Sequence, residues 1–223
     1  MKEQPILFSA PMVRAIITGM KTQTRRVVKP QPIEFGGEIV HPGAIMLAAI
    51  FGHDVSAEEI KEIKPECPFG VPGDRLWVRE SARVASVTTG HKPWYTVEYK
   101  AGGPDLVRYE KMPGRWFPRK AHNVQGDRLW CPAIHTPRWA SRLTLEIVSV
   151  RVERLVGISD ADAQAEGITY EHAIEFADDG SPDYVLAFRE LWESVSGKGS
   201  WEADPWVWVV EFEVVKPETA GGS

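Results

Sequence analysis

The fold of this chain is organised around one stretch near its start, Gly19-Met20-Lys21-Thr22-Gln23-Thr24-Arg25-Arg26. Upstream of it, Ile6-Leu7-Phe8 predicts a short buried strand, and Pro11 is placed as in the first turn of a helix. Gly19 falls where a left-handed residue commonly ends a helix, so this helix should be about two turns long. The backbone should therefore turn sharply before Lys21, and residues 21–24 should lie at the mouth of whatever the helix packs against.

The charge of this region differs from that of the whole chain. Residues 9–30 carry five basic side chains and no carboxylate, whereas the complete sequence has a net charge of -5. A local concentration of positive charge in an acidic protein predicts contact with an anionic or strongly polar ligand. A solvated basic loop after a helix is the other interpretation, and charge alone leaves both open.

Length and composition predict one domain of ordinary globular character. The chain has 223 residues, of which 43% are hydrophobic and 26% are charged, which is enough for one sizeable core. We expect a single domain over residues 1–217, with insertions at about 33–72 and 101–140, where Pro and Gly punctuate the sequence. The tail at residues 218–223 is expected to be disordered.

The sequence also predicts the compartment and the absence of a cofactor. No apolar run approaches the ~20 residues of a membrane span, and the residues after Met1 lack the apolar core of a signal peptide. Cys67 and Cys131 are too few for a disulfide framework, and Cys131-x-x-x-His135 is too loosely spaced for a convincing zinc site. We therefore expect a cytoplasmic protein that has no metal, no cofactor and no membrane partner.

A strand is predicted over residues 75–84, following the turn Pro72-Gly73-Asp74. Leu76 and Val78 alternate with more polar residues, and the same alternation carries Glu80 onto the apolar face. Because a carboxylate on an inward face is rarely left unpaired, Glu80 should meet a basic group or line a cavity. The alternative is that the strand has left the core by this residue, so that Glu80 faces water.

Three further elements are predicted in the second half of the chain. Residues 141–155 form a long strand in which Leu145 and Ile147 share one face and Val148 and Val152 continue on the other, a phase change that predicts a β-bulge. Ser181-Pro182 opens an amphipathic helix whose apolar stripe extends to Val195. The last strand spans residues 205–215.

The loop-rich segment at residues 101–140 combines basic and aromatic side chains. These side chains are Arg115, Arg119, Lys120, Arg128 and Arg138, with Trp116, Trp130 and Trp139 between them. Interleaved guanidinium groups and indoles can grip phosphates while stacking on bases. Tryptophan is also a good core filler, so we expect only one or two of them to touch a ligand.

A short helix is predicted to begin with Ser159 as its N-cap and to end at Gly167, with Asp162 completing a capping box. Glu166 then lies in the last turn, where the negative end of the helix dipole disfavours a carboxylate. A local rule broken in this way often marks a functional residue, although an exposed glutamate would cost only tenths of a kcal/mol there.

The motif Gly19-x-Lys21-x-x-Thr24 after a strand and a helix resembles the opening motif of the ASCH domain, a small β-barrel of the PUA-like superfamily. The longer run from Ile6 to Pro32, together with residues 72–80 and 137–142, is similar to the larger ASCH proteins of phage and prophage genomes. The resemblance implies an α+β fold, namely a mostly antiparallel β-barrel with short flanking helices and long inserted loops. It also implies the host cytoplasm as the location if the chain is phage-encoded.

Members of this family include an amidohydrolase that removes the acetyl group from N4-acetylcytidine, reported ribonucleases and RNA binders. Ala165-Glu166-Gly167-Ile168-Thr169 is similar to the segment that carries the catalytic glutamate of the amidohydrolase. The resemblance therefore implies a catalytic trio of Lys21, Thr24 and Glu166, acting on a modified nucleoside or on single-stranded nucleic acid. The residues expected to bind the substrate are Thr22, Arg25, Arg26, Arg79, Glu80, Arg138 and Trp139.

The chemistry of the trio would be acyl transfer. The Thr24 hydroxyl is inert until a base activates it, and Lys21 could be that base if burial or the neighbouring arginines lower its pKa. Glu166 could orient the lysine or activate a water, and either Thr24 or the water would attack the acetyl carbonyl. Two alternatives stay open at this point. They are a nucleic-acid-binding module without catalysis and a ribonuclease that uses His122 or His135 as acid or base.

Overall fold

The computed structural model describes residues 1–35, 38–40, 66–88, 94–103, 106–108, 130–176 and 180–215. The apolar run at residues 44–51, the helix start at residues 56–59 and the tail at residues 218–223 lie outside the described residues. The same holds for the basic and aromatic residues predicted in the loop, which are Arg115, Trp116, Arg119, Lys120, His122 and Arg128.

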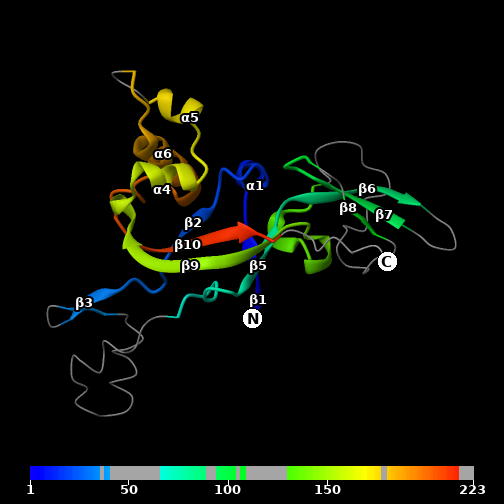
Figure 1. The fold of residues 1–223 in the computed structure, drawn as a ribbon, viewed down its shortest axis with the longest axis horizontal. Helices are drawn as coiled ribbons and strands as arrows, with labels where there is room; N and C mark the ends of the chain where they lie inside the picture. The colour runs from blue at the N-terminus through cyan, green and yellow to red at the C-terminus, as the bar shows by residue number, and fades with distance from the viewer. Residues whose placement is uncertain are drawn as a thin grey trace, which may run out of the picture. The chain divides into compact units, whose positions relative to one another are not determined.

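Strands precede and follow a group of short helices in the chain (Figure 1). The strands are β1 (Glu3–Leu7), β2 (Gln23–Val27), β3 (Ile33–Phe35), β4 (Glu38–Val40), β5 (Arg75–Arg79), β6 (Ala82–Thr88), β7 (Trp94–Tyr99), β8 (Leu106–Arg108), β9 (Thr144–Arg154) and β10 (Trp206–Val214). The α-helices are α1 (Ala10–Ile17), α4 (Asp160–Ala165), α5 (Tyr170–Ile174) and α6 (Tyr184–Ser196). Three single-turn 3₁₀ helices are η3 (Ala133–His135), η4 (Arg138–Ala140) and η5 (Leu155–Gly157).

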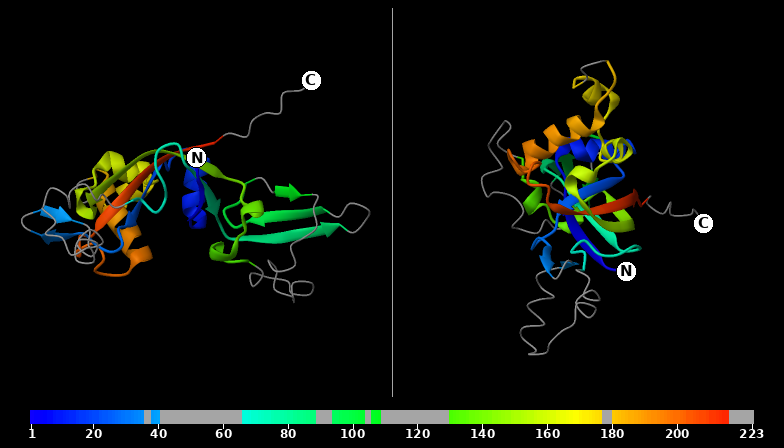
Figure 2. Two further views of the ribbon diagram at one scale, coloured as in Figure 1. Left: turned by 90° about the horizontal axis from the view of Figure 1, so that it is seen from below. Right: turned by 90° about the vertical axis from the view of Figure 1, so that its left-hand side faces the viewer.

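The described strands form open sheets that are mostly antiparallel. The largest sheet has the order β1-β5-β9-β10-β2, and smaller sheets pair β3 with β4 and β6 with β7 and β8. β1 pairs with β5 in parallel, whereas β5–β9, β10–β2, β3–β4, β6–β7 and β7–β8 are antiparallel. The hairpin of β6 and β7 is visible as two adjacent strands in Figure 2. The predicted α+β class is therefore confirmed, although the described strands do not close into a barrel.

The chain divides into two compact units. Unit 1 contains residues 1–19, 73–147 and 212–223, and unit 2 contains residues 20–72 and 148–211, so that β9 and β10 contribute residues to both. The expectation of one domain over residues 1–217, with its two insertions, stays a prediction. None of the described helices is both long and apolar enough to cross a membrane.

The start of unit 1 follows the sequence prediction closely. α1 has Pro11 in its first turn and buries Val13 and Ile16, and Gly19 has a φ of 76°, the left-handed conformation predicted for it. The predicted strand at residues 75–84 is interrupted at Glu80 and Ser81 and continues as β6. The apolar side chains Ile6, Leu76, Val78, Leu145 and Ile147 are all buried.

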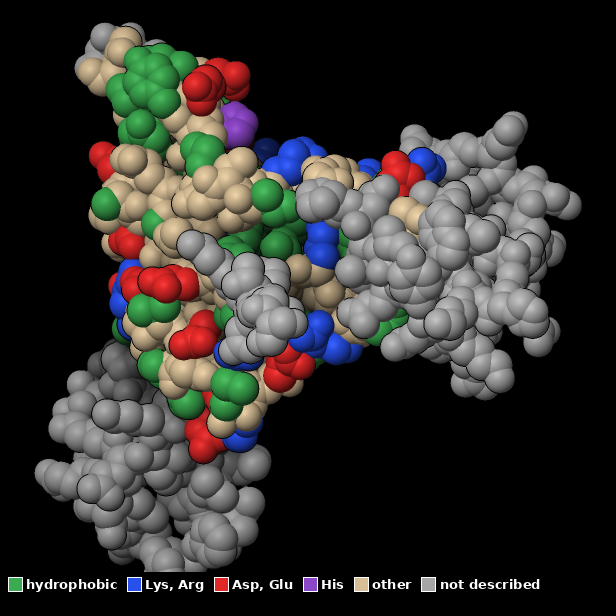
Figure 3. Space-filling view, turned by 45° about the vertical axis from the view of Figure 1, so that its right-hand side comes forward, with side chains coloured by type: hydrophobic (Ala, Val, Ile, Leu, Met, Phe, Trp, Pro, Cys, Tyr) green, Lys and Arg blue, Asp and Glu red, His purple; other side chains and the backbone are tan. Residues whose placement is uncertain are grey.

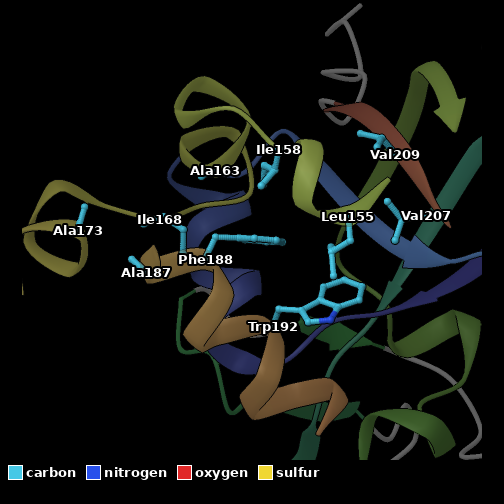
Figure 4. Packing of buried hydrophobic residues seen from close by; sticks show 10 residues of the cluster. All are labelled: Leu155, Ile158, Ala163, Ile168, Ala173, Ala187, Phe188, Trp192, Val207 and Val209. Carbon is cyan, nitrogen blue, oxygen red and sulfur yellow. The ribbon is translucent and has the colours of Figure 1, made fainter. Parts of the chain in front are cut away.

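The core of unit 2 is built by the helices and β10 (Figure 4). Phe188 and Trp192 from α6 pack in one hydrophobic cluster with residues of α4, α5, η5 and β10. α4 and α5 both contact α6, and the three helices lie together in Figure 1. α6 begins at Tyr184 with Asp183 as its N-cap, slightly later than Ser181-Pro182 predicted.

Two apolar predictions in unit 2 are wrong. Val195, expected on the buried stripe of α6, is 62% exposed and lies one residue before the end of the helix. The phase change predicted in β9 is not seen in the burial, because Leu145 and Ile147 are buried whereas Val148 and Val152 are 49% and 36% exposed. The β-bulge inferred from it stays a prediction. The polar side chains of Arg151 and Glu153, which alternate with these valines, make the inward contacts instead.

Candidate functional site

Lys21 and Glu166 are in direct contact inside unit 2. The Lys21 ammonium donates hydrogen bonds to Glu166 Oε2 at 2.6 Å and to the Glu166 carbonyl oxygen at 2.8 Å. The two residues also form an isolated antiparallel β-bridge, and the Thr22 backbone N–H donates to the Ala165 carbonyl at 2.8 Å. The side chains of Lys21, Thr24 and Glu166 are all buried, because these residues are only 2%, 3% and 5% exposed.

α4 places Glu166 at this position through its two ends. Ser159 is the N-cap and forms the predicted capping box with Asp162, in which each residue's side chain accepts a hydrogen bond from the other's backbone N–H. At the other end Glu166 is the C-cap, and Gly167 leaves the helix with a φ of 96°. The unfavourable location of a carboxylate at a helix C-terminus is thus offset by the Lys21 ammonium.

Ser159→Ala is expected to lower the free energy of unfolding by about 1 kcal/mol, because the backbone N–H of Asp162 loses its acceptor. The measurement is urea denaturation followed by far-ultraviolet circular dichroism. Ser196→Ala is a matched control, since Ser196 is exposed at the end of α6. Equal midpoints for the two variants would contradict a contribution from the cap.

Arg25 lies behind the lysine and binds three carboxylates. Its Nη1 is 3.3 Å from Glu166 Oε1, and its Nη2 is 3.3 Å from Glu153 Oε2 and 3.5 Å from Asp162 Oδ2. The Arg25 guanidinium carbon also lies 5.9 Å from the centre of the Phe188 ring, in the range of a cation–π contact. Arg25 is therefore fully enclosed by side chains of β9, α4 and α6.

Further polar groups surround this centre. Gln23 donates to the carbonyl and to Oδ1 of Asp162 at 2.9 and 3.0 Å, and Arg151 Nη2 binds the same Oδ1 at 2.8 Å. Arg151 also pairs with Glu153 and Glu211. Burial alone would raise the pKa of Asp162, but hydrogen bonds from Ser159 and Gln23 and the charge of Arg25 outweigh burial and hold this pKa below its ordinary value.

The charges of this cluster nearly balance. Its cations are Lys21, Arg25 and Arg151, and its carboxylates are Glu153, Asp162, Glu166 and Glu211, three against four. The basic stretch is therefore neither a solvated loop nor an open cationic surface at Lys21 and Arg25, because both side chains are buried and paired. The charge pattern did not indicate this buried pairing, since the acidic partners lie more than a hundred residues away.

Burial lowers the pKa of Lys21 from its ordinary value, and the charges of Arg26 and Arg25 act in the same direction. The Glu166 carboxylate opposes this change but does not reverse it. A lysine of lowered pKa is closer to the neutral amine that can accept a proton. The direction of this change is the one that a role of Lys21 as a base would need.

The remaining predicted site residues within residues 19–26 point in a different direction from Lys21 and Arg25. In β2, Thr24 pairs with Val210 of β10 and Arg26 pairs with Trp208. Strand alternation directs Thr24 and Arg26 to the face opposite that of Gln23 and Arg25. Thr22 is exposed. The structure thus brings Lys21, Arg25 and Glu166 together, and it directs Thr24 to the other side of the strand.

Glu80 belongs to unit 1 and confirms the expectation that it meets a basic group. Its Oε1 and Oε2 accept hydrogen bonds from Arg142 Nε and Nη2 at 2.8 and 3.0 Å. Arg142 also donates to the Gly102 carbonyl at 2.7 Å, and its guanidinium lies over the Tyr99 ring at 4.0 Å. The Glu80 carboxylate is therefore held by a structural partner.

Arg79, Arg138 and Trp139 also lie in unit 1. Arg79 Nε donates to the Thr136 carbonyl at 3.1 Å, and Arg138 forms a two-point ion pair with Glu3 at 2.7 and 2.9 Å. Both guanidinium groups lie over the Trp77 ring, at 5.4 and 6.0 Å. Trp139 is partly buried against a small cluster that includes Tyr99. These arginines already have internal partners.

Gln23, Arg151, Glu153, Asp162 and Glu211 are members of the cluster that the sequence did not identify. For Arg151 and Glu153 the local signal is charge within the valine-rich strand β9. Among the described residues, no three His, Cys, Asp or Glu side chains are grouped so that they could hold a metal ion.

Comparison with known proteins adds distant structural neighbours only. No family model matches the chain, and no curated protein matches it. Among solved structures, the chain is similar to an Enterococcus faecalis protein that is assigned to the family model DUF984. The two share 13% identity and a TM-score of 0.34, and the match covers 100% of this chain and 86% of that one. The chain is also similar to an ASCH domain from Lactobacillus crispatus, with 10% identity and a TM-score of 0.38 over 96% of this chain and 79% of that one.

Proposed function

We propose that the protein is a hydrolase that removes a small acyl group from the exocyclic N4 amide of a modified cytidine. The observation that carries the proposal is the direct contact of Lys21 with Glu166, residues separated by 145 positions in the sequence. This is the amine–carboxylate pair that the resemblance to the N4-acetylcytidine amidohydrolases requires. The lowered pKa of Lys21 supports its use as a base.

The reaction converts N4-acetylcytidine and water into cytidine and acetate. Once the Lys21 ammonium has released a proton, its neutral amine takes the proton of the nucleophile as the nucleophile attacks the acetyl carbonyl, and the ammonium formed again stabilises the tetrahedral oxyanion. The same ammonium then returns the proton to N4 as the amide bond breaks. Glu166 orients the amine and balances its charge. Because strand alternation directs Thr24 away from the Lys21–Glu166 pair, the favoured nucleophile is a water. Attack by the Thr24 hydroxyl, followed by hydrolysis of the acyl-enzyme by water, is the alternative.

The charge balance of the cluster favours a neutral substrate over a phosphate. A ribonuclease would use Lys21 and Arg25 to stabilise a negatively charged phosphorane, but both cations are engaged by carboxylates. Acidic and basic side chains are also interspersed over the described part of the face in Figure 3. An acetylated nucleobase brings no charge into the site.

The burial of the trio favours a small acyl group. Because Lys21, Thr24 and Glu166 are each at most 5% exposed, a substrate has little room to reach them, which favours a compact group such as acetyl over a bulky one. The rate should therefore fall from N4-acetylcytidine to N4-benzoylcytidine. Comparison of kcat/KM for the two nucleosides checks this expectation, and equal values would contradict it.

The main test follows cytidine release from N4-acetylcytidine by chromatography. The wild type should convert it, and Lys21→Arg should lower kcat by about a hundredfold or more, because an arginine does not serve as a base. Ser196→Ala, which changes an exposed residue, should retain full activity. A folded wild type that releases no cytidine, or a fully active Lys21→Arg variant, would overturn the proposal.

Thr24→Ala identifies the nucleophile. Loss of activity with retained fold assigns attack to the Thr24 hydroxyl, and full activity assigns it to water and removes Thr24 from the trio.

If the wild type is inactive, the alternative of a binding module is tested with single-stranded RNA. Phosphate contacts then require an affinity that falls steeply with salt.

A further inference from the structure

Arg25 is placed where it can act on Glu166, and the ion pairs of its guanidinium are all with carboxylates of the protein. Its side chain is completely buried, although sequence reasoning assigned it to substrate binding. Its Nη1 is 3.3 Å from Glu166 Oε1, whereas Lys21 uses the other oxygen, Oε2, at 2.6 Å. The two cations therefore hold the two oxygens of one carboxylate.

We propose that Arg25 is a positioning residue, which fixes the rotation of the Glu166 carboxylate so that Oε2 stays directed at Lys21. A carboxylate held through one oxygen can rotate about its terminal bond, since this torsion has only broad preferences. A second contact on the other oxygen removes that freedom. The consequence for catalysis rests on the proposed function, but the effect on the Lys21–Glu166 hydrogen bond does not.

Arg25 is itself held from several elements. Glu153 of β9 and Asp162 of α4 both bind its Nη2, and Phe188 of α6 lies beneath the guanidinium. Arg151 in turn binds both Glu153 and Asp162. The planar guanidinium can serve three carboxylates at once because its nitrogens point in fixed, different directions.

A lysine at this position would keep the charge but lose that arrangement. The ammonium is a single point on a flexible stem, so it cannot reach Glu166 Oε1 and the two acids on the opposite side together. Arg25→Lys therefore separates positioning from charge. Arg25→Gln removes the charge as well.

The first experiment measures the Lys21 ammonium directly, by ¹H–¹⁵N correlation spectra of protein with ¹⁵N-labelled lysine. In the wild type, its hydrogen bonds to Glu166 Oε2 and to the Glu166 carbonyl should slow proton exchange and make the signal visible. The signal, assigned by its loss in Lys21→Arg, should broaden or vanish in Arg25→Lys and in Arg25→Gln. It should be unchanged in Arg189→Gln, a matched change at an exposed ion pair with Glu202 in unit 2.

The second experiment uses hydrolysis of N4-acetylcytidine. Arg25→Lys should lower kcat by about tenfold to a hundredfold while KM stays within about twofold, since substrate binding does not involve Arg25. A rise in KM with unchanged kcat would overturn the proposal and make Arg25 a substrate-binding group. An inactive wild type would refute the proposed hydrolase function but not the positioning role of Arg25. The Lys21 ammonium signal tests that role independently of activity.

An unchanged Lys21 signal in folded Arg25→Lys protein would also overturn the proposal. If neither Arg25 variant folds, Glu153→Gln replaces them, since Glu153 is partly exposed and is one of the groups that hold Arg25. It should accelerate exchange of the Lys21 ammonium relative to the wild type. No acceleration in Glu153→Gln would then count against positioning.

Discussion

Glu166→Gln is expected to lower the free energy of unfolding by about 3–5 kcal/mol, the range for removing one partner of a buried ion pair. The substitution keeps the shape of the side chain but removes the negative charge shared by Lys21 and Arg25. Lys21 loses the carboxylate oxygen at 2.6 Å, while it stays buried. Urea denaturation of both proteins, followed by circular dichroism and tryptophan fluorescence, measures the difference.

The control for this prediction removes the cation as well. Lys21→Met combined with Glu166→Gln leaves no buried charge unpaired at this contact, so the double variant should be more stable than Glu166→Gln alone. A single variant as stable as the wild type would show that the ion pair contributes nothing to folding. A double variant less stable than the single one would show that Lys21 stabilises the protein by packing.

Arg142→Met is expected to have an effect of similar size in unit 1, about 3–5 kcal/mol near neutral pH. It leaves the Glu80 carboxylate, which is 2% exposed, without its two-point partner, and it also removes the hydrogen bond to Gly102 and the contact with Tyr99. Arg83→Met is the matched control, because the Arg83–Glu98 pair is partly exposed. That control should cost about 0–1 kcal/mol.

The cost of Arg142→Met should depend on pH in a defined direction. Burial raises the pKa of Glu80, and Arg142 opposes that rise in the wild type. A carboxyl group whose pKa is raised in the folded state binds protons more readily there than in the unfolded state. Its contribution to the free energy of unfolding therefore falls as pH rises through the raised pKa. The variant lacks the opposing charge, so its deficit should be smaller at about pH 5 than at about pH 8. Equal deficits at both pH values would contradict this account.

Features set by local chemistry could be predicted from the sequence. The end of α1 at Gly19, the Ser159–Asp162 capping box and the end of α4 at Gly167 each depend on a few adjacent residues. The partnered state of Glu80 was also predictable, because alternation placed a charge on an apolar face. α5 was missed, although Thr169 provides its N-cap, because a helix of five residues has too little periodicity to be recognised.

The identity of the partners could not be predicted in the same way. Nothing near Arg142 indicates Glu80, and nothing near Arg25 indicates Glu153 or Asp162, because the pairings depend on how distant segments meet. The contact of Lys21 with Glu166 was expected only through a family resemblance. The substrate-binding role of Arg25 was inferred from its charge, and its burial now favours an internal role.

The separation of Lys21 from Glu166 has a consequence for synthesis on the ribosome. At the usual rates of translation, the 145 residues from Thr22 to Glu166 take roughly 7–30 s to be added. Throughout that interval the emerging segment carries its cations without the acids of α4 and β9. Nascent chains should therefore expose a transiently basic N-terminal segment, whose charge is neutralised only when the last third of the protein has left the exit tunnel.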